Sequence, residues 1–305
     1  MSRPGSGRTT RIEPLARAHL ETATRVLADA CEFDRAADVA EEKLFGAAPL
    51  GTATTFGAWE GTELVGVATV AAAWIRVLAV EPSVRGRGIG SALLAACEAT
   101  ALASGESKLR ALDQPGNYLA PGIDAENVET IAWLERRGWV RSAEPRTNVL
   151  IAVRDNPRVS ADRIAELTRA VAGRGYEIRR ARPDETALLG AVGAEFGGAW
   201  PFELARALGE SPAGVHVATN DGAYCAFAAH DGNNRGLGWF GPTGTWPAHR
   251  GQGLGEVLLL ACLLDVAARH SHCEVAWIGP RPFYDKVAGI ARDRHFIALS
   301  RTLAR

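Results

Sequence analysis

The chain has 305 residues, about two domains of ordinary size, and its 47% hydrophobic and 23% charged residues are the balance of a globular protein with a core. The formal net charge is −1, which excludes a strongly basic nucleic-acid-binding or membrane-surface protein. The five cysteines are odd in number and form no Cys-x-x-Cys pair, so neither a disulfide framework nor a metal site is expected.

The first half of the chain alternates strand and helix patterns, separated by glycine-containing turns. In chain order the predicted elements are helix 15–30, strands 54–59, 64–71 and 74–80, helix 91–103, strand 108–112, helix 126–137 and strand 149–153. The strand over 149–153 is expected to close this unit. Residues 154–160, which contain Asn156-Pro157, are the expected linker, so the predicted domains are 1–155 and 156–305.

The second half repeats this order after an additional helix. Its predicted elements are helix 161–173, strand 176–181, helical residues 184–209, strands 214–219, 223–230 and 238–245, helix 256–269, strand 274–278, helix 282–288 and strand 295–301. The last strand is expected to complete the second unit. Strands and helices in this order predict a mixed α/β sheet in each half.

An internal repeat supports the duplication. Residues 78–90 align without gaps with residues 243–255, 165 positions later. Each copy has a proline three residues before an arginine, then Arg-Gly-x-Gly-x-Gly at 85–90 or 250–255, then a long apolar helix. A period this long indicates a duplicated domain and not a solenoid.

A glycine-rich turn between a strand and a helix exposes several backbone N–H groups at the positive end of the helix. The two turns are therefore candidate pyrophosphate sites, to which Arg85 and Arg250 add positive charge; the alternative is a turn that only caps the helix. A Rossmann dinucleotide site is rejected for two reasons. The Rossmann loop follows the first strand of its domain, whereas the loops of this chain follow the fourth, and Glu256 replaces the third glycine in the second copy.

Both loops resemble the acetyl-CoA motif of the GNAT superfamily, Gln/Arg-x-x-Gly-x-Gly/Ala after a fourth strand. The resemblance covers nearly the whole chain twice and implies two tandem GNAT domains that bind acetyl-CoA as co-substrate, without a metal. It implies that the CoA pyrophosphate contacts loop residues Arg85, Gly86, Arg87, Gly88, Ile89 and Gly90, and Arg250, Gly251, Gln252, Gly253, Leu254 and Gly255.

The same resemblance implies a role for the strand that precedes each loop. Its backbone amides pair with the pantetheine arm and polarise the thioester carbonyl, and such an amide contributes about 3 kcal/mol when it faces a developing oxyanion. By alignment these residues are Leu78, Ala79 and Val80 in the first copy, and Thr243, Gly244 and Thr245 in the second.

In the family an amine attacks the thioester directly in a ternary complex, which requires a base for the ammonium proton and an acid for the departing thiolate. The acid is commonly a tyrosine in a pattern such as Phe-Tyr-x-Lys-x-Gly. Tyr284, in Pro-Phe-Tyr-Asp-Lys, is therefore the catalytic candidate of the second domain. Leu134 occupies that position in the first domain, which leaves three interpretations: a unit that binds acetyl-CoA without fast transfer, a unit that uses another acid, or a structural remnant.

The base stays open among several polar or aromatic side chains near the expected acceptor site, each of which is more often a surface residue. The candidates are Glu81, Trp246, His249, His230, Asp231, Glu195 and Glu203.

Two segments, residues 117–124 and 277–284, resemble the tandem glucosamine and glucosaminide N-acetyltransferases, which implies an amino-sugar amine as acceptor; the alternative is that their Pro-Gly and Gly-Pro pairs are turn formers. A mycothiol-synthase-like enzyme, an antibiotic acetyltransferase and a non-catalytic acetyl-CoA-binding sensor are the other hypotheses. The polar N-terminus and the short apolar run 257–264 favour a cytoplasmic protein without membrane or nucleic-acid partners. A monomer with pseudo-dimeric domains or a homodimer is expected.

Overall fold

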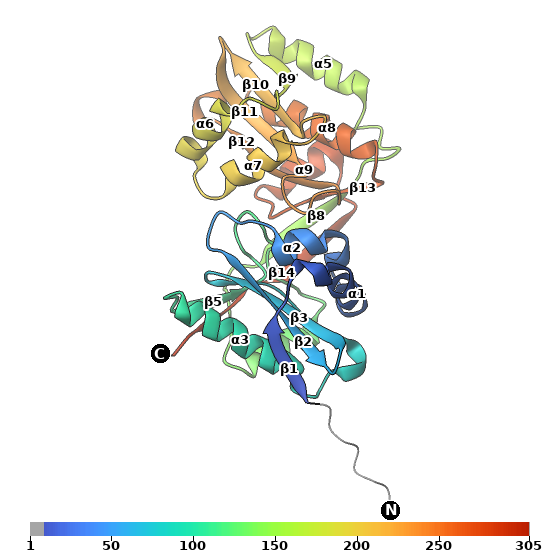
Figure 1. Cartoon of the computed structure of the whole chain (residues 1–305). Coiled ribbons are helices and arrows are strands. Elements are labelled where there is room, and N and C mark those ends of the chain that lie inside the picture. The colour runs from blue at the N-terminus through green and yellow to red at the C-terminus, as the bar shows by residue number, and fades with distance from the viewer. Residues whose placement is uncertain (1–8, 305) are drawn as a thin grey trace, which may run out of the picture. The chain divides into compact units, whose positions relative to one another are not determined.

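The computed structural model describes residues 9–304 and divides into two compact units. The first unit is Met1–Pro145 together with Phe296–Arg305, and the second is Arg146–His295 (Figure 1). The predicted boundary between residues 155 and 156 therefore falls inside the second unit.

Most elements of the first unit match the predicted ranges within a few residues. They are β1 (Thr10–Pro14), α1 (Leu20–Ala30), α2 (Ala40–Phe45), β2 (Ala53–Glu60), β3 (Glu63–Ala71), β4 (Trp74–Val80), α3 (Ile89–Ala103), β5 (Lys108–Ala111), β6 (Ile123–Asp124), α4 (Val128–Glu135), β7 (Val140–Arg141) and β15 (Leu299–Thr302), with 3-10 turns η1 (Arg17–His19), η2 (Ala36–Val39) and η3 (Pro82–Val84).

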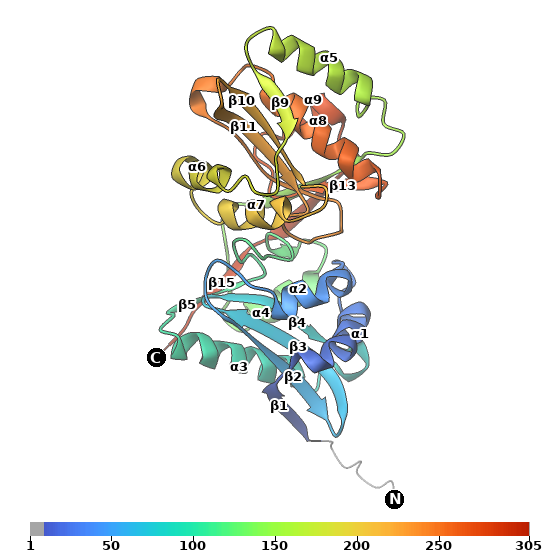
Figure 2. The same ribbon diagram turned by 45° about the horizontal axis from the view of Figure 1, so that its top comes forward.

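The sheet of the first unit has the order β1-β2-β3-β4-β5-β15-β7. Strands β4 and β5 run parallel and pair at Trp74–Arg110 and Ile75–Ala111. Helix α3 covers one face of the sheet, and α1 and α2 cover the other (Figures 1 and 2). Buried α3 residues such as Leu93 and Cys97, four positions apart, pack on the sheet, which explains why this apolar segment is helical.

The second unit repeats the arrangement. Its elements are β8 (Arg146–Ala152), α5 (Ala161–Ala172), β9 (Glu177–Arg180), α6 (Ala187–Phe196), α7 (Trp200–Leu208), β10 (Val215–Asn220), β11 (Ala223–His230), β12 (Trp239–Thr245), η4 (Pro247–His249), α8 (Leu254–Ala267), β13 (His272–Val275), α9 (Arg281–Ala288) and β14 (Arg292–Ile297). Within it the strands lie in the order β14-β8-β13-β12-β11-β10-β9. Helices α6 and α7 lie on one face of the sheet, and α5 and α8 on the other (Figure 2).

Two predicted strand placements are wrong. The strand at 149–153, expected to close the first unit, is β8 and pairs antiparallel with β13 in the second unit, for instance Cys273 with Ile151. The strand at 295–301 is two strands, of which β15 pairs with β5 and β7 in the first unit. Alternation of apolar residues defines which face of a strand is buried but not which strand lies beside it.

The helical segment predicted at 184–209 is divided into α6 and α7. Gly197 and Gly198 lie between them with φ of 63° and 64°, a backbone conformation that no helix contains. Strand β1 and helix α2 were not predicted at all, because each is short and carries too few apolar residues to show a period.

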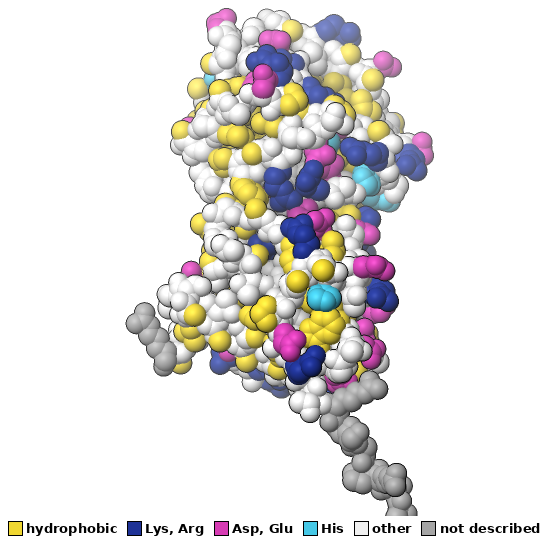
Figure 3. Space-filling view, viewed as in Figure 1, with side chains coloured by type: hydrophobic (Ala, Val, Ile, Leu, Met, Phe, Trp, Pro, Cys, Tyr) yellow, Lys and Arg dark blue, Asp and Glu magenta, His cyan; other side chains and the backbone are white. Residues whose placement is uncertain are grey.

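Charged and apolar side chains are interspersed on the face of the molecule seen in Figure 3. Among the described helices, none combines the length and hydropathy that a membrane crossing would need.

The placement of β15 predicts that the C-terminal segment stabilises the first unit. In a chain that ends at His295, β5 keeps β4 but loses β15, its other neighbouring strand, and Glu98 loses its ion pair with Arg301, at 2.6 Å. Hydrogen exchange is therefore expected to accelerate in peptides of β3, β4 and β5, because an unpaired edge opens more readily. Peptides of β10 and β11 serve as the internal control, and faster exchange in those strands alone would contradict the prediction.

Candidate functional site

The two repeated loops have the same backbone conformation. Arg85 has φ −60° and ψ 159°, and its counterpart Arg250 has φ −67° and ψ 153°. Gly88 and Gly253, which cap α3 and α8, have φ of 85° and 77°. A 3-10 turn precedes each loop, η3 or η4. The aligned residues therefore build the same turn twice.

The glycines have two functions in this turn. Gly86 and Gly251 also have positive φ, of 78° and 76°, which residues with a side chain rarely adopt. A Cβ atom on Gly86, Gly88 or Gly251 would meet no atom within 4 Å, so the space in front of the backbone is open. Open amides at a helix N-terminus are a site for a phosphate-bearing ligand.

The two loop arginines shape the turn. Arg85 donates through Nε to the carbonyl of Val80 at 3.1 Å, and Arg250 donates in the same way to Thr245 at 3.3 Å. Arg87, in contrast, pairs with Glu60 at 2.6 Å. Arg85 and Arg250 therefore lie beside the open amides of their loops, whereas the side chain of Arg87 is directed to Glu60.

A cleft of about 950 Å³ opens at the loop of the first unit. The end of β4, the loop, the start of α3 and one face of α4 line it. The predicted residues among its walls are Leu78, Val80, Arg85, Gly86, Gly88, Ile89 and Gly90. Ala79 is buried on the opposite face of β4, since successive side chains of a strand alternate.

The sequence interpretation missed the residues that α4 contributes to this cleft. The Arg137 guanidinium lies 4.2 Å from the ring centroid of Trp133 and donates to Ser91 Oγ at 2.9 Å. Trp133 approaches the Cβ position of Gly90 to 3.5 Å. Arg136 also lines the cleft. The available signal for a positively charged side of this cleft was the pair Arg136 and Arg137, three and four residues after Trp133 in the predicted helix 126–137.

In the second unit an arginine from outside the loop, Arg174, also contacts the glycine-rich turn. It donates to the carbonyl of Gln252 at 2.8 Å and so adds a second guanidinium to this loop. Glu256, in the first turn of α8, forms an ion pair with Arg163 of α5 at 3.0 Å, which offsets a carboxylate that would otherwise repel phosphate.

Both strands that precede the loops carry a bulge. In β4, Val77 and Ile75 lie opposite Thr69 and Val70, which leaves Arg76 without an opposed residue. In β12 the register shifts between the pairs of Thr243 and Phe240, at Gly241 and Pro242. The predicted pantetheine residues, 78–80 and 243–245, follow these bulges. Pro242 has no N–H, so an oxyanion donor in this strand must be another amide.

Tyr284 lies in α9 and packs against the N-terminal end of β12. Its ring contacts Phe240, which precedes the bulge, with centroids 6.5 Å apart, and Phe283 at 5.1 Å. Phe283 lies over Gly255 as Trp133 lies over Gly90, so Tyr284 and Leu134 are equivalent in the two units. The residue is 6% exposed, and burial raises the pKa of its hydroxyl to about 12. The hydroxyl therefore stays protonated at physiological pH and is a proton donor.

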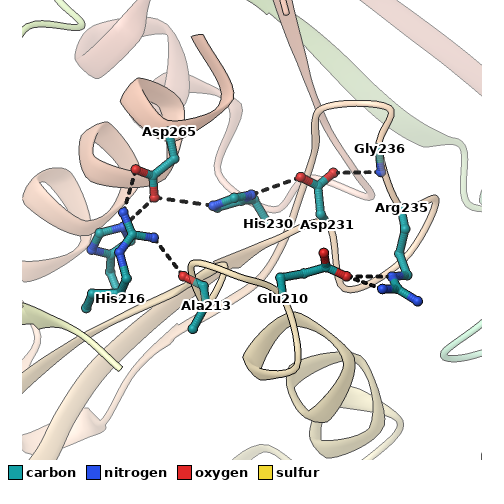
Figure 4. A network of polar contacts seen from close by, with 9 residues as sticks. Glu210, Ala213, His216, His230, Asp231, Arg235, Gly236 and Asp265 are labelled. Carbon is teal, nitrogen blue, oxygen red and sulfur yellow. Dashed lines mark hydrogen bonds and ion pairs between the residues drawn. The ribbon is translucent and has the colours of Figure 1, made fainter. Parts of the chain in front are cut away.

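Two of the candidate bases belong to a buried network at the end of β11 (Figure 4). His230 contacts Asp231 through Nδ1 at 3.1 Å and Asp265 through Nε2 at 3.3 Å. Asp265 also accepts from His216, at 2.7 Å, and from Arg180, at 2.6 Å. His230 thus has a carboxylate at each ring nitrogen.

The electrostatics of this network oppose a base role for His230. Burial alone would lower the pKa of His230, but the hydrogen bonds to Asp231 and Asp265 outweigh it and raise the pKa. Burial would raise the pKa of Asp265, and hydrogen bonds from His216, His230 and Arg180 hold it far below the usual range. Because a carboxylate contacts each ring nitrogen, His230 has no free nitrogen for the proton of an acceptor amine, so the network has a structural role.

The other base candidates differ in their surroundings. In the first unit burial, followed by the nearby Glu63 and Asp29, raises the pKa of Glu81, the direction that a base requires. In the second unit His249 contacts the Tyr176 hydroxyl at 3.1 Å, and Trp246 packs on Phe196 and Phe227. Glu195 is exposed and Glu203 is buried in α7. Within residues 9–304 no group of His, Cys, Asp or Glu side chains is arranged to hold a metal.

Comparison with known proteins identifies the fold. Residues 19–139 match the sequence model of the acetyltransferase (GNAT) family. No curated protein sequence matches the chain. The chain resembles a tandem GNAT protein from the clavulanic acid biosynthesis pathway, with a TM-score of 0.71, 22% identity, and coverage of 97% of this chain and 99% of that one.

Two further solved structures share the fold. One is the GCN5-related glucosamine N-acetyltransferase region of a fungal multi-domain GH3 β-N-acetylglucosaminidase, with a TM-score of 0.76 and 16% identity over 98% of this chain. This chain spans 39% of the length of that enzyme. The other is a GCN5-related N-acetyltransferase from Sphaerobacter thermophilus, with a TM-score of 0.63 and 16% identity over 97% of this chain and 96% of that one.

Proposed function

We propose that this chain, a tandem protein with two units of the GNAT fold, transfers the acetyl group of acetyl-CoA to a primary amine of a small molecule. The GNAT family match of residues 19–139 implies acyl transfer from an acyl-CoA. The observation that carries the proposal is the pair of loops with the same backbone conformation, each open in front of its first glycine, Gly86 or Gly251, and each at a helix N-terminus. Such loops accept the pyrophosphate of CoA.

The reaction follows from the groups around β12. The amine nitrogen, once a base has taken its proton, attacks the thioester carbonyl carbon and forms the C–N bond. A backbone amide near the bulge stabilises the negative charge on the carbonyl oxygen. As the C–S bond breaks, the CoA sulfur leaves as a thiolate that accepts a hydrogen bond from Tyr284, the nitrogen loses its second proton to solvent, and solvent protonates the thiolate. The products are an acetamide and CoA.

The pKa of about 12 constrains how Tyr284 acts. A thiol has a pKa of about 8.5, so this hydroxyl is the weaker acid. Complete proton transfer to a thiolate would be uphill, whereas a hydrogen bond that strengthens as charge develops on sulfur lowers the barrier at no such cost. Tyr284 is therefore proposed as a donor to the leaving group.

An amino sugar is the proposed acceptor class. The segments 117–124 and 277–284 resemble tandem glucosamine and glucosaminide N-acetyltransferases, and the fungal structure with the same fold is described as a glucosamine N-acetyltransferase region. The amine of such a sugar is less basic than that of lysine, so less free energy is needed to deprotonate it near neutral pH.

Release of CoA thiol tests this proposal. With acetyl-CoA and a panel of amines, we expect the highest kcat/KM for glucosamine-type amines, and lower values for a cysteine-bearing amino-sugar conjugate and for aminoglycosides. A preference for the conjugate would favour the mycothiol-synthase-like alternative. Binding of acetyl-CoA at both loops without turnover of any amine would refute an enzyme and support a sensor.

A further inference from the structure

We propose that the first unit holds acyl-CoA but is closed to the acceptor amine at Arg76, so that acyl transfer takes place in the second unit, where Gly241 occupies the equivalent position. This inference rests on the proposed function, and it assigns Arg76 and Gly241 as the residues that decide which unit admits the acceptor.

The position of Arg76 follows from the length of the strand. Residues in a strand rise about 3.3 Å each, so the four residues from Val80 back to Arg76 span about 13 Å. A pantetheine arm that starts at the loop and follows Val80 and Leu78 reaches the bulge at Arg76 with its thioester end. An attacking amine must approach the thioester at this point.

In the first unit the side chain of Arg76 fills the space through which an amine would approach the bulge. Arg76 is fully buried, and its Nε donates to Gln114 Oε1 at 2.7 Å. Its Nη1 donates to the carbonyls of Gly46 at 2.8 Å and Lys43 at 3.2 Å. One guanidinium thus connects β4 to the end of α2 and to the segment that follows β5.

A second group of hydrogen bonds holds the same two segments together. Lys43 is fully buried and donates to Asn117 Oδ1 at 2.9 Å and to Glu42 at 2.7 Å. Asn117 donates in turn to the carbonyl of Ala47 at 2.8 Å. Separating the end of α2 from the segment after β5 would leave the buried charges of Arg76 and Lys43 without partners, which is strongly unfavourable and keeps the two segments together.

The second unit lacks this closure. The constant offset of 165 residues between β4 and β12 makes Gly241 the counterpart of Arg76, and a Cβ atom on Gly241 would meet no atom within 4 Å. The segment between β13 and α9 is also much shorter, residues 276–280, than residues 112–127 between β5 and α4. The unit that carries Tyr284 is therefore also the unit with open space at its bulge.

Reaction of bound acetyl-CoA with hydroxylamine tests the inference without any knowledge of the natural acceptor. Hydroxylamine converts the thioester to acetohydroxamate and CoA thiol. Two full-length variants direct acetyl-CoA to one unit each: Gly251→Asp places a carboxylate in the second loop, and Gly86→Asp places one in the first. The unmodified chain, in which neither loop carries an added carboxylate, is the reference and is expected to bind acetyl-CoA at both loops.

In Gly251→Asp, acetyl-CoA bound to the first unit is expected to react at least about tenfold more slowly than free acetyl-CoA, because reaction then requires local opening. In Gly86→Asp, the thioester bound to the second unit is expected to react at about the free rate or faster. Adding Arg76→Gly to Gly251→Asp is expected to remove the protection, and Gln114→Ala serves the same purpose if thermal unfolding shows that Arg76→Gly is not folded.

Equal reactivity in the two units, or protection in the second alone, would overturn the inference. Failure of acetyl-CoA to bind the unmodified chain would instead overturn the proposed function.

Discussion

The Tyr284→Phe variant is expected to lose a factor of about 10² to 10³ in kcat while its KM for acetyl-CoA stays the same, since the hydroxyl acts on the leaving sulfur and not on CoA binding. The phenyl ring keeps the edge contacts with Phe240 and Phe283, so the fold is expected to be unchanged. Steady-state kinetics with a saturating amine measure the effect.

Tyr224→Phe is the matched control, because it removes a tyrosine hydroxyl that bonds to Glu185 at 2.8 Å, outside the site. It is expected to keep kcat. The pKa of about 12 adds a second criterion: the pH profile of kcat should show no descending limb from Tyr284 below about pH 10. Equal losses in the two variants would remove Tyr284 from the reaction.

The Asp265→Asn variant is expected to lower the free energy of unfolding by about 3–5 kcal/mol, the usual cost of removing one partner from a buried charge cluster. Asp265 is the carboxylate that joins His216, His230 and Arg180. Without it His230 retains only Asp231, and His216 loses its carboxylate. Urea unfolding measures the change.

The pH dependence of this loss has a defined sign. Because the folded pKa of His230 is raised above 6.5, its contribution is fully present below pH 6.5 and is lost as pH rises through the folded value. The lowered pKa of Asp265 makes its contribution present above pH 3.8 and lost as pH falls through the folded value. The difference between wild type and Asp265→Asn should therefore be largest between these limits and shrink at alkaline pH.

Asp293→Asn is the control for this second prediction. Asp293 forms a more exposed ion pair with Arg281, at 2.9 Å, and such pairs contribute less than about 1 kcal/mol. If Asp265→Asn lowered the free energy of unfolding at pH 5.5 by no more than Asp293→Asn does, the network around Asp265 would not stabilise the fold as its geometry indicates.

The sequence was informative where a short segment determines its own conformation. The repeated Arg-Gly-x-Gly-x-Gly turns need positive φ at fixed positions, so glycine spacing predicted both loops, and they have the same dihedral angles. The tandem GNAT fold and the cleft residues from Leu78 to Gly90 followed from this motif. The comparison of Leu134 with Tyr284 also needed only alignment, and the positions of Trp133 and Phe283 agree with it.

The sequence failed where partners are distant. His230 and Asp231 were candidate bases because histidine and aspartate are suitable residue types, but Asp265, 35 positions from His230, contacts the second ring nitrogen of the histidine. Strands β8 and β15 were assigned to the wrong units, because a strand pattern does not specify its neighbour. Arg76 had the appearance of an ordinary strand residue, since Gln114 and Gly46 are brought to it only by folding.

By itself, then, the sequence determined two glycine-rich turns of the same conformation and singled out the tyrosine that we propose as the donor to the leaving group, because glycine spacing and local alignment act within a few residues. Only the tertiary structure decided which polar groups contact one another, which strands complete each unit, and that a buried arginine lies at one bulge and a glycine at the other. Burial and long-range pairing determine these properties, and both arise from contacts between residues tens of positions apart.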